Sequence, residues 1–244
     1  EIVIRAFLRS SDPTSAEIMA LAGVDLIVID NEHYPFNPQR METIIRAAET
    51  YGAECMVRVP NTEPARIAQI MDMGAIGVVV PHIESREEAL AVVDAVKYAP
   101  VGHRGFCPIT RAADYGFTAS PADYPVRANR DSVVSIMVET KRGLENLDEI
   151  LSIPEIDVVA IGPSDVSASY GLPGQPDHPV VKAAIEEGQR KIIASGKCLC
   201  DLYKNPEQAK KAIRSGVRMF QIGSPLQLLS GGFKELIQGV KARM

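Results

Sequence analysis

The feature that most constrains the fold of this chain is a regular alternation of short β-branched runs with longer amphipathic stretches. The short runs are mostly continuously apolar, as expected for parallel strands that are covered on both faces. The predicted strands are residues 2–8, 25–30, 55–60, 77–81, 133–139, 157–162, 197–202 and 218–223. The stretches between and after them predict helices at residues 14–22, 38–51, 64–73, 86–98, 143–151, 178–195, 205–215 and 225–243.

The positions of proline and glycine support these boundaries. Prolines 38, 64 and 206 fall in the first turn of a predicted helix, and a glycine follows several helical runs just before the next strand. An alternation of strand and helix that is repeated eight times predicts one (β/α)8 barrel domain over residues 1–244, and barrels of this kind typically have about 250 residues. The competing doubly wound sheet would carry Gly-x-Gly-x-x-Gly after the first strand, where this chain reads "LRSSDPTS".

One segment departs from the regular pattern. Residues 99–131 are far longer than an ordinary connection, and they contain no clear strand or helix signal. Because long loops on such a scaffold usually serve the functional site, we expect this segment to border it.

Composition excludes several classes of protein. The net charge of −5 comes without a clustered basic excess, which disfavours a nucleic-acid partner. No apolar run approaches the ~20 residues that cross a membrane. The cysteines at 55, 198 and 200 lie in apolar strand-like runs, so we interpret them as buried reduced thiols of a cytoplasmic protein.

Polar side chains recur where the predicted strands end. The second strand runs into "DNEH" and delivers His33, and the third carries Arg58 in "VRVP". The fifth strand ends in Glu139, and the sixth runs into "GPSD" with Asp165. Because the carboxyl ends of all strands in a parallel barrel share one rim, we expect these four side chains to meet there.

Each of these residues also has an ordinary structural explanation. His33 could be a loop histidine, Arg58 and Glu139 could form a buried ion pair, and Asp165 could cap a helix. Together on one rim they indicate a site for metal-assisted acid–base chemistry. Two carboxylates suit Mg²⁺ or Mn²⁺, a guanidinium stabilises an oxyanion, and an imidazole moves protons near neutral pH.

Several segments resemble one known family over nearly the whole chain: "DNEH", "RVP", "MDMGAIGVVVP", "HRG", "VET" and "IGPSDVSASYG". The chain is similar to the HpcH/HpaI family of class II, metal-dependent pyruvate aldolases. The resemblance implies a phosphoenolpyruvate/pyruvate-binding type of barrel that cleaves a 4-hydroxy-2-oxo acid to pyruvate and an aldehyde. It also implies a homo-oligomer, typically a hexamer built as a trimer of dimers, with C-terminal helices exchanged between subunits.

The resemblance assigns catalytic roles by position. His33 corresponds to the general base, and Arg58 to the residue that stabilises the enolate. Asp72, in "IMDMG", matches an aspartate that raises the basicity of the histidine. Asp72 ends a helix at the opposite end of its own barrel, so either a neighbouring subunit supplies it or it is only a helix-end aspartate. Because the resemblance implies a hexamer with exchanged C-terminal helices, we favour the neighbouring subunit.

The resemblance also assigns a metal site and a substrate site. Glu139 and Asp165 match the metal ligands, for Mg²⁺ or Mn²⁺ and conceivably Co²⁺, with no organic cofactor. The turn that contains Gly162, Ser164 and Asp165 matches the backbone that holds the pyruvate carboxylate. Met137 stands where the family usually has glutamine, and it lies on the same strand face as Glu139. This difference, together with "PHIES" and "GSPLQ" at other strand ends, leaves the aldehyde open.

Two other functions fit the same residues. A metal-dependent acyl-CoA lyase of the citramalyl or malyl type would need a basic groove for the phosphates. The arginines of residues 99–131 could form that groove, although acidic residues are interspersed among them. A barrel that only binds a keto acid is the third interpretation, and the presence of all four rim residues argues against it.

Overall fold

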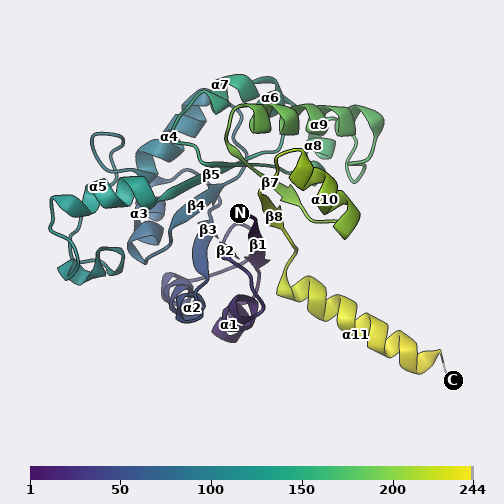
Figure 1. The fold of residues 1–244 in the computed structure, drawn as a ribbon, viewed down its shortest axis with the longest axis horizontal. Coiled ribbons are helices and arrows are strands. Elements are labelled where there is room, and N and C mark those ends of the chain that lie inside the picture. Colours follow the sequence, from purple (N-terminus) through teal and green to yellow (C-terminus); the bar gives the residue numbers. More distant parts are fainter. Residues whose placement is uncertain (243–244) are drawn as a thin grey trace.

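The computed structural model describes residues 1–242 and shows a closed barrel of eight parallel strands in the order of the sequence (Figure 1). Each strand pairs with its neighbours in the chain, and β1 pairs with β8 to close the cylinder. The (β/α)8 prediction is therefore confirmed, because the pairing of β1 with β8 closes the sheet and leaves no edge strand. The strands are β1 (Val3–Leu8), β2 (Leu26–Asp30), β3 (Glu54–Arg58), β4 (Gly77–Val80), β5 (Val133–Val138), β6 (Val158–Ile161), β7 (Cys198–Leu202) and β8 (Met219–Gln221).

The helices lie outside the strands and follow the predicted alternation. Several begin as the sequence indicates: the side chains of Asn37 and Asn205 each accept a backbone N–H from the first turn of the helix that follows. The principal helices are α1 (Pro13–Leu21), α2 (Pro38–Thr50), α3 (Pro64–Asp72), α4 (Arg86–Val96), α9 (Pro179–Ala194), α10 (Pro206–Arg214) and α11 (Pro225–Lys241).

Two details of the helical layer differ from the prediction. The helix expected at 143–151 is two short helices, α6 (Lys141–Glu145) and α7 (Leu147–Leu151), separated by Asn146. A further short helix, α8 (Pro163–Ser169), follows β6 directly. This helix matters for the site because it places the "GPSD" turn at the carboxyl end of its strand.

Buried apolar side chains form two layers. The larger layer lies between the barrel and its helices, and the smaller fills the barrel interior with residues such as Phe7, Met56 and Cys200. Two arginines of the barrel strands, Arg5 and Arg58, are also buried, with exposed fractions of 1% and 5%. Buried guanidinium groups need a physical explanation because burying a charge is costly.

The segment 99–131 lies at the end of the barrel opposite to the site, so the expectation that it borders the site of its own chain is wrong. It connects α4 to the start of β5, and such αβ connections lie at the amino ends of the strands. The segment is also partly ordered, with a 3₁₀ turn (Arg111–Gly116) and a helix, α5 (Asp123–Asp131).

The last helix, α11, stands away from the barrel rather than packing on it (Figure 1). Its large apolar side chains are exposed, including Leu228, Phe233 and Leu236. A mostly apolar hollow of about 580 Å³ lies between α11, α1 and the adjoining strand ends. Residue 243, the end of the predicted helix, lies outside the described residues.

None of the helices in residues 1–242 has the length and apolar character that a membrane crossing requires.

Candidate active site

A cavity of about 230 Å³ opens at the carboxyl ends of the strands. It gathers residues from β1, β3, β5, β6, β7 and β8 together with the turn that precedes α8. Seven of the eight residues that the sequence assigned to the site line this cavity. They are His33, Arg58, Met137, Glu139, Gly162, Ser164 and Asp165.

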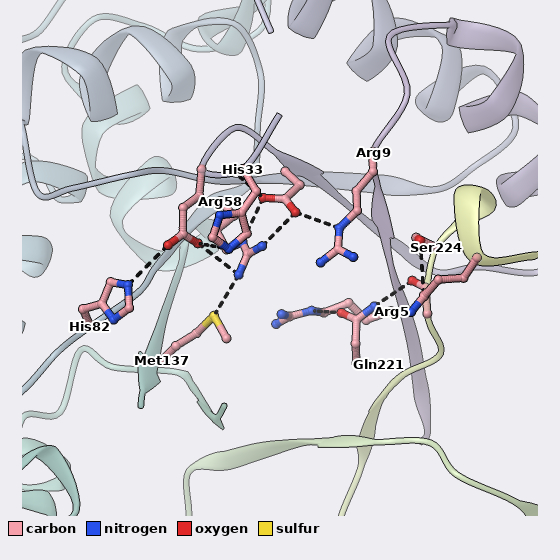
Figure 2. Close-up of polar contacts among 12 residues, drawn as sticks. Arg5, Arg9, His33, Arg58, His82, Met137, Gln221 and Ser224 are labelled. Atoms are coloured by element: carbon pink, nitrogen blue, oxygen red, sulfur yellow. Dashed lines mark hydrogen bonds and ion pairs between the residues drawn. The ribbon is translucent and has the colours of Figure 1, made fainter. Parts of the chain in front are cut away.

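Arg58 is held by carboxylates of the neighbouring strand (Figure 2). Asp30 and Arg58 are register partners, and two nitrogens of Arg58 donate to the two oxygens of Asp30 at 3.0 and 2.7 Å. A third nitrogen, Nη1, lies 3.0 Å from Glu32. The guanidinium also stacks on the Phe7 ring, with 4.5 Å to the ring centroid. Arg58 therefore pairs with Asp30 and Glu32, and not with Glu139 as its simplest structural explanation assumed.

The Asp30 carboxylate is fully buried and accepts hydrogen bonds from two arginines. Besides Arg58, it accepts a hydrogen bond of 2.8 Å from Nε of Arg9. Burial alone would raise the pKa of this carboxyl, but the guanidinium groups of Arg58 and Arg9 outweigh burial and hold the pKa below its ordinary value. Asp30 is therefore ionised at neutral pH, and its carboxylate fixes the orientation of Arg58.

His33 lies at the mouth of the cavity, with its side chain 60% exposed. Its backbone N–H donates to Asp30 at 3.4 Å, and its Nε2 lies 3.7 Å from Glu32. The turn after β2 thus anchors the backbone of His33 and leaves the imidazole accessible. An accessible imidazole beside a small cavity can exchange protons with a bound molecule.

Glu139 is the buried acid of the cavity. It is 3% exposed, and its Oε2 accepts the backbone N–H of His82 at 3.2 Å. Burial, assisted by the nearby charges of Asp165 and Glu32, raises its pKa above the ordinary value. Gly162 lies against the same carboxylate, and a β-carbon at this position would overlap a Glu139 oxygen. Glycine is therefore required here so that β6 can pass next to the Glu139 carboxylate.

His82 is a site residue to which the sequence gave no role. It follows β4 with a φ of 57°, a backbone conformation that non-glycine residues rarely adopt. Its imidazole lies between two acids, with Nδ1 3.5 Å from Glu139 and Nε2 3.4 Å from Glu32. Figure 2 shows the contact with Glu32. In the sequence, its role could have been inferred from its position directly after a predicted strand, in "VVVPH".

Arg5 and Arg9 also line the cavity and were not predicted. Both lie in the first strand or directly after it, in "VIRAFLR". The signal for Arg5 is the same as for Arg58, namely a basic residue inside an apolar strand. In Figure 2 the guanidinium groups of Arg5, Arg9 and Arg58 point toward one region of the barrel mouth.

Asp72 does not belong to the cavity of its own chain. It is the last residue of α3, at the opposite end of the barrel, where Arg104 donates to it at 2.5 Å. The structure thus agrees that Asp72 cannot reach His33 within one subunit. Its side chain is 29% exposed and faces a second hollow lined by residues of α2, α3 and the 99–131 segment.

The basic groove on which the acyl-CoA lyase interpretation depends is not formed at the site. Arginines 104, 111 and 127 of the long segment lie at the amino end of the barrel, and they pair there with Asp72, Glu49 and Asp114, respectively. Their charges are thus compensated within the chain and lie far from the cavity.

The carboxylates of the cavity fit a divalent cation. Glu139 is buried, and it forms no ion pair with a lysine or arginine of residues 1–242, so its charge lacks a strong partner. Asp165, in the first turn of α8, lines the same cavity. Within these residues no group of three or more typical ligand side chains is found. Two carboxylates with the remaining positions open is the arrangement that Mg²⁺ and Mn²⁺ commonly use with a chelating substrate.

Comparison with known proteins gives the class. A family model described as HpcH/HpaI aldolase/citrate lyase matches residues 4–231. A hydroxypyruvate/pyruvate aldolase of Sagittula stellata is 41% identical over 181 residues, which is 74% of this chain and 70% of that protein. A 4-hydroxy-2-oxo-heptane-1,7-dioate aldolase of Escherichia coli is 36% identical over 93% of this chain and 86% of its own length.

Solved structures agree with the sequence relatives. The crystal structure of an HpcH/HpaI aldolase/citrate lyase family protein from Burkholderia cenocepacia J2315 superimposes with a TM-score of 0.91 at 28% identity, and the match covers 99% of this chain and 95% of that one. The chain therefore belongs to the HpcH/HpaI aldolase/citrate lyase family. It is a carbon–carbon lyase of the aldolase class, and the interpretation as a non-catalytic barrel is set aside.

Proposed function

We propose that this chain catalyses the reversible cleavage of a 4-hydroxy-2-oxo acid to pyruvate and an aldehyde, with help from a bound divalent cation. One observation supports this most strongly. A single small cavity brings together an accessible imidazole (His33), a fixed guanidinium (Arg58) and two acids (Glu139 and Asp165). These are the groups needed to remove a hydroxyl proton and to stabilise the enolate that is released.

Glu139 and Asp165 would hold the cation, which we expect to be Mg²⁺ or Mn²⁺. When bound, such an ion acts as a Lewis acid toward the 2-oxo group and the neighbouring carboxylate. The raised pKa of Glu139 supports this role, because a buried carboxylate without a cationic partner is stabilised by a nearby positive ion. Backbone N–H groups of Ser164 and Asp165 in the first turn of α8 have no partner within the helix, and they would bind the substrate carboxylate.

Arg58 would stabilise the negative charge that develops on the 2-oxo oxygen as the carbon–carbon bond breaks. Its position is fixed in advance by Asp30, Glu32 and the Phe7 ring, so little reorganisation is needed when the charge appears. The residue nevertheless lines the cavity, and its Nη1 lies beside the sulfur of Met137.

His33 would take the proton from the C4 hydroxyl. The bond between C3 and C4 then breaks, C4 becomes the aldehyde carbon, and the electron pair remains on C3 as the pyruvate enolate. Protonation of C3 yields pyruvate. In the direction of condensation, His33 returns its proton to the new hydroxyl. The exposure of His33 at the mouth of the cavity supports this assignment, because the aldehyde enters and leaves there.

The test is a coupled assay for pyruvate release from several 4-hydroxy-2-oxo acids. We expect activity that is lost after exhaustive chelation and restored by Mn²⁺ or Mg²⁺, and we expect Glu139→Gln to be inactive. Glu145→Gln is the matched control, because Glu145 is an exposed acid on α6. Activity that survives chelation would exclude the metal role. Failure to cleave any member of the series would exclude the aldolase assignment for these substrates.

We also propose that the working enzyme is a symmetric oligomer in which α11 of one subunit packs on the barrel of another. The exposed apolar residues of α11 and the hollow between α11 and α1 support this proposal. In such an assembly Asp72 would reach the His33 of a neighbouring subunit.

Mixing two inactive variants tests the shared site. Asp72→Asn and His33→Ala should each lose activity alone. After the two are unfolded and reassembled together, hybrid oligomers should regain part of the activity, because some sites then combine an intact His33 with an intact Asp72. No recovery in oligomers that are shown to be mixed would contradict the exchange, and Asp148→Asn, which changes an exposed acid of α7, is the control.

A further inference from the structure

Arg5 is a buried cation without a counter-charge. Its side chain points into the barrel from the middle of β1 and lines the cavity, yet the residue is only 1% exposed (Figure 2). Its Nε donates to the amide oxygen of Gln221 at 2.9 Å, and its Nη1 has no hydrogen-bond acceptor within residues 1–242. A buried guanidinium without an anion is strongly unfavourable, so a compensating group is expected.

Residues 1–242 do not supply that group. Asp30 is already shared by Arg58 and Arg9, and Glu32 lies against Arg58. The thiols of Cys198 and Cys200 are also close to Arg5, but burial raises the pKa of both, and they therefore remain neutral. An anion that compensates Arg5 must come from outside the chain, through the cavity that Arg5 lines.

Arg5 and the acids of the cavity come from different strands of the barrel. Glu139 directly follows β5, Gly162 directly follows β6 and Asp165 lies in the first turn of α8, whereas Arg5 and Gln221 belong to the paired strands β1 and β8. A 2-oxo acid whose own carboxylate is held at the α8 turn would extend from there toward Arg5. The volume of the cavity, about 230 Å³, suits a small molecule.

We propose that Arg5 is a specificity-determining residue that binds a second acidic group on the substrate, so that this chain prefers short 2-oxo acids with two carboxylates. This inference rests on the proposed function for the orientation of the 2-oxo acid. Gln221 holds Nε of Arg5, which leaves the two terminal nitrogens for a carboxylate. The second acid could lie on the pyruvate half of the substrate or on the aldehyde half.

Two matched pairs of ligands distinguish these sources. Oxaloacetate and 2-oxobutanoate differ in whether C3 carries a carboxylate or a methyl group. The same difference occurs at C4 between 2-oxoglutarate and 2-oxopentanoate, neither of which has a hydroxyl group to cleave. Calorimetry of the Mn²⁺-loaded enzyme with each ligand should show the diacid of one pair binding about 10- to 100-fold more tightly than its monoacid. The pair that shows the preference identifies the half that carries the acid.

Variants assign the preference to Arg5. Arg5→Met should abolish it, Arg5→Lys should retain part of it, and Arg190→Met on the exposed face of α9 should leave it unchanged. Equal binding within both pairs, or a preference that survives Arg5→Met, would overturn the proposal. The preference of the unaltered chain needs no variant, so its absence is decisive even if Arg5→Met fails to fold.

The binding experiment also separates this inference from the proposed function. Diacid binding through Arg5 without pyruvate release from any hydroxy acid would overturn the aldolase assignment and leave the role of Arg5 standing. Pyruvate release without any preference for diacids would overturn only the role of Arg5.

Discussion

Two buried arginines project into the same barrel, and their surroundings differ sharply. Arg58, on β3, has contacts with Asp30 and Glu32 and stacks on Phe7. Arg5, on β1, also lies over the Phe7 ring, at 5.4 Å, but its hydrogen-bond partner is one neutral amide, and one of its nitrogens has no acceptor in the described residues. The carboxylates beside Arg58 hold its guanidinium in place before substrate binds. The guanidinium of Arg5 has no such carboxylate, so it is free to bind an acidic group of a ligand. We therefore expect Arg58 to act in catalysis and Arg5 in substrate selection.

The largest expected effect concerns the compensated arginine. Arg58→Ala should lower kcat by about 100- to 1,000-fold, because a preorganised donor to the developing oxyanion is lost. The measurement is steady-state release of pyruvate with saturating Mn²⁺. Arg190→Ala, which removes an exposed arginine of α9, should leave kcat unchanged. Full activity of Arg58→Ala would remove this residue from the mechanism.

A smaller effect is expected when the counter-charge is removed. Asp30→Asn should destabilise the fold by about 3 kcal/mol at pH 7, because two guanidinium groups lose their shared carboxylate. The folded pKa of Asp30 lies below its ordinary value of 3.8, so its contribution to stability is present above that pH. The contribution is lost as the pH falls through the folded pKa.

Denaturant unfolding at a series of pH values checks this prediction. The difference between the native chain and Asp30→Asn should be full at pH 6–7 and should shrink below about pH 4. A difference that does not vary with pH would show that Asp30 acts through packing rather than through its charge. Asp148→Asn, which changes an exposed acid of α7, provides the control.

The smallest expected effect is a gain in stability. Glu139→Gln should raise the free energy of unfolding of the metal-free protein by about 1 kcal/mol, because it replaces a buried charge with a neutral side chain of the same shape. The raised pKa of Glu139 means that the cost of its charge is full above the folded pKa and is relieved as the pH falls through it.

Thermal unfolding in the presence of EDTA measures this gain, which should be present at pH 8 and should decrease in acid. With Mn²⁺ the order should reverse, because only the native glutamate gains from the cation. A lower Tm for Glu139→Gln in EDTA would show that Glu139 is a stabilising partner of His82, and the argument for a metal-binding role would weaken.

Most of the barrel could be predicted from local patterns. Continuous apolar runs such as "DLIVID" and glycine-marked helix ends depend on neighbours in the sequence, so all eight strands were found within a few residues. The rim residues His33, Arg58, Glu139 and Asp165 followed from the general rule that the carboxyl ends of parallel strands form one face. The structure brings these four into one cavity.

The long segment 99–131 shows where such reasoning failed. Its length indicated a functional loop, but its place between α4 and β5 puts it at the amino end of the barrel. The order of elements was already sufficient to show this, since every connection from a helix to a strand lies on that face. In this case, loop length was the weaker signal and topology the stronger one.

The sequence by itself determined the closed cylinder, because strand and helix periodicity is local and the alternation admits few topologies. It also indicated that four strands, β2, β3, β5 and β6, carry chemistry to the rim, although it gave no role to the arginines in or directly after β1 or to His82 after β4. Only the tertiary structure decided which charge meets which, because the partners of a buried ion come from strands far apart in the chain. It paired Arg58 with Asp30, placed His82 between two acids, and left Arg5 with no acid beside it.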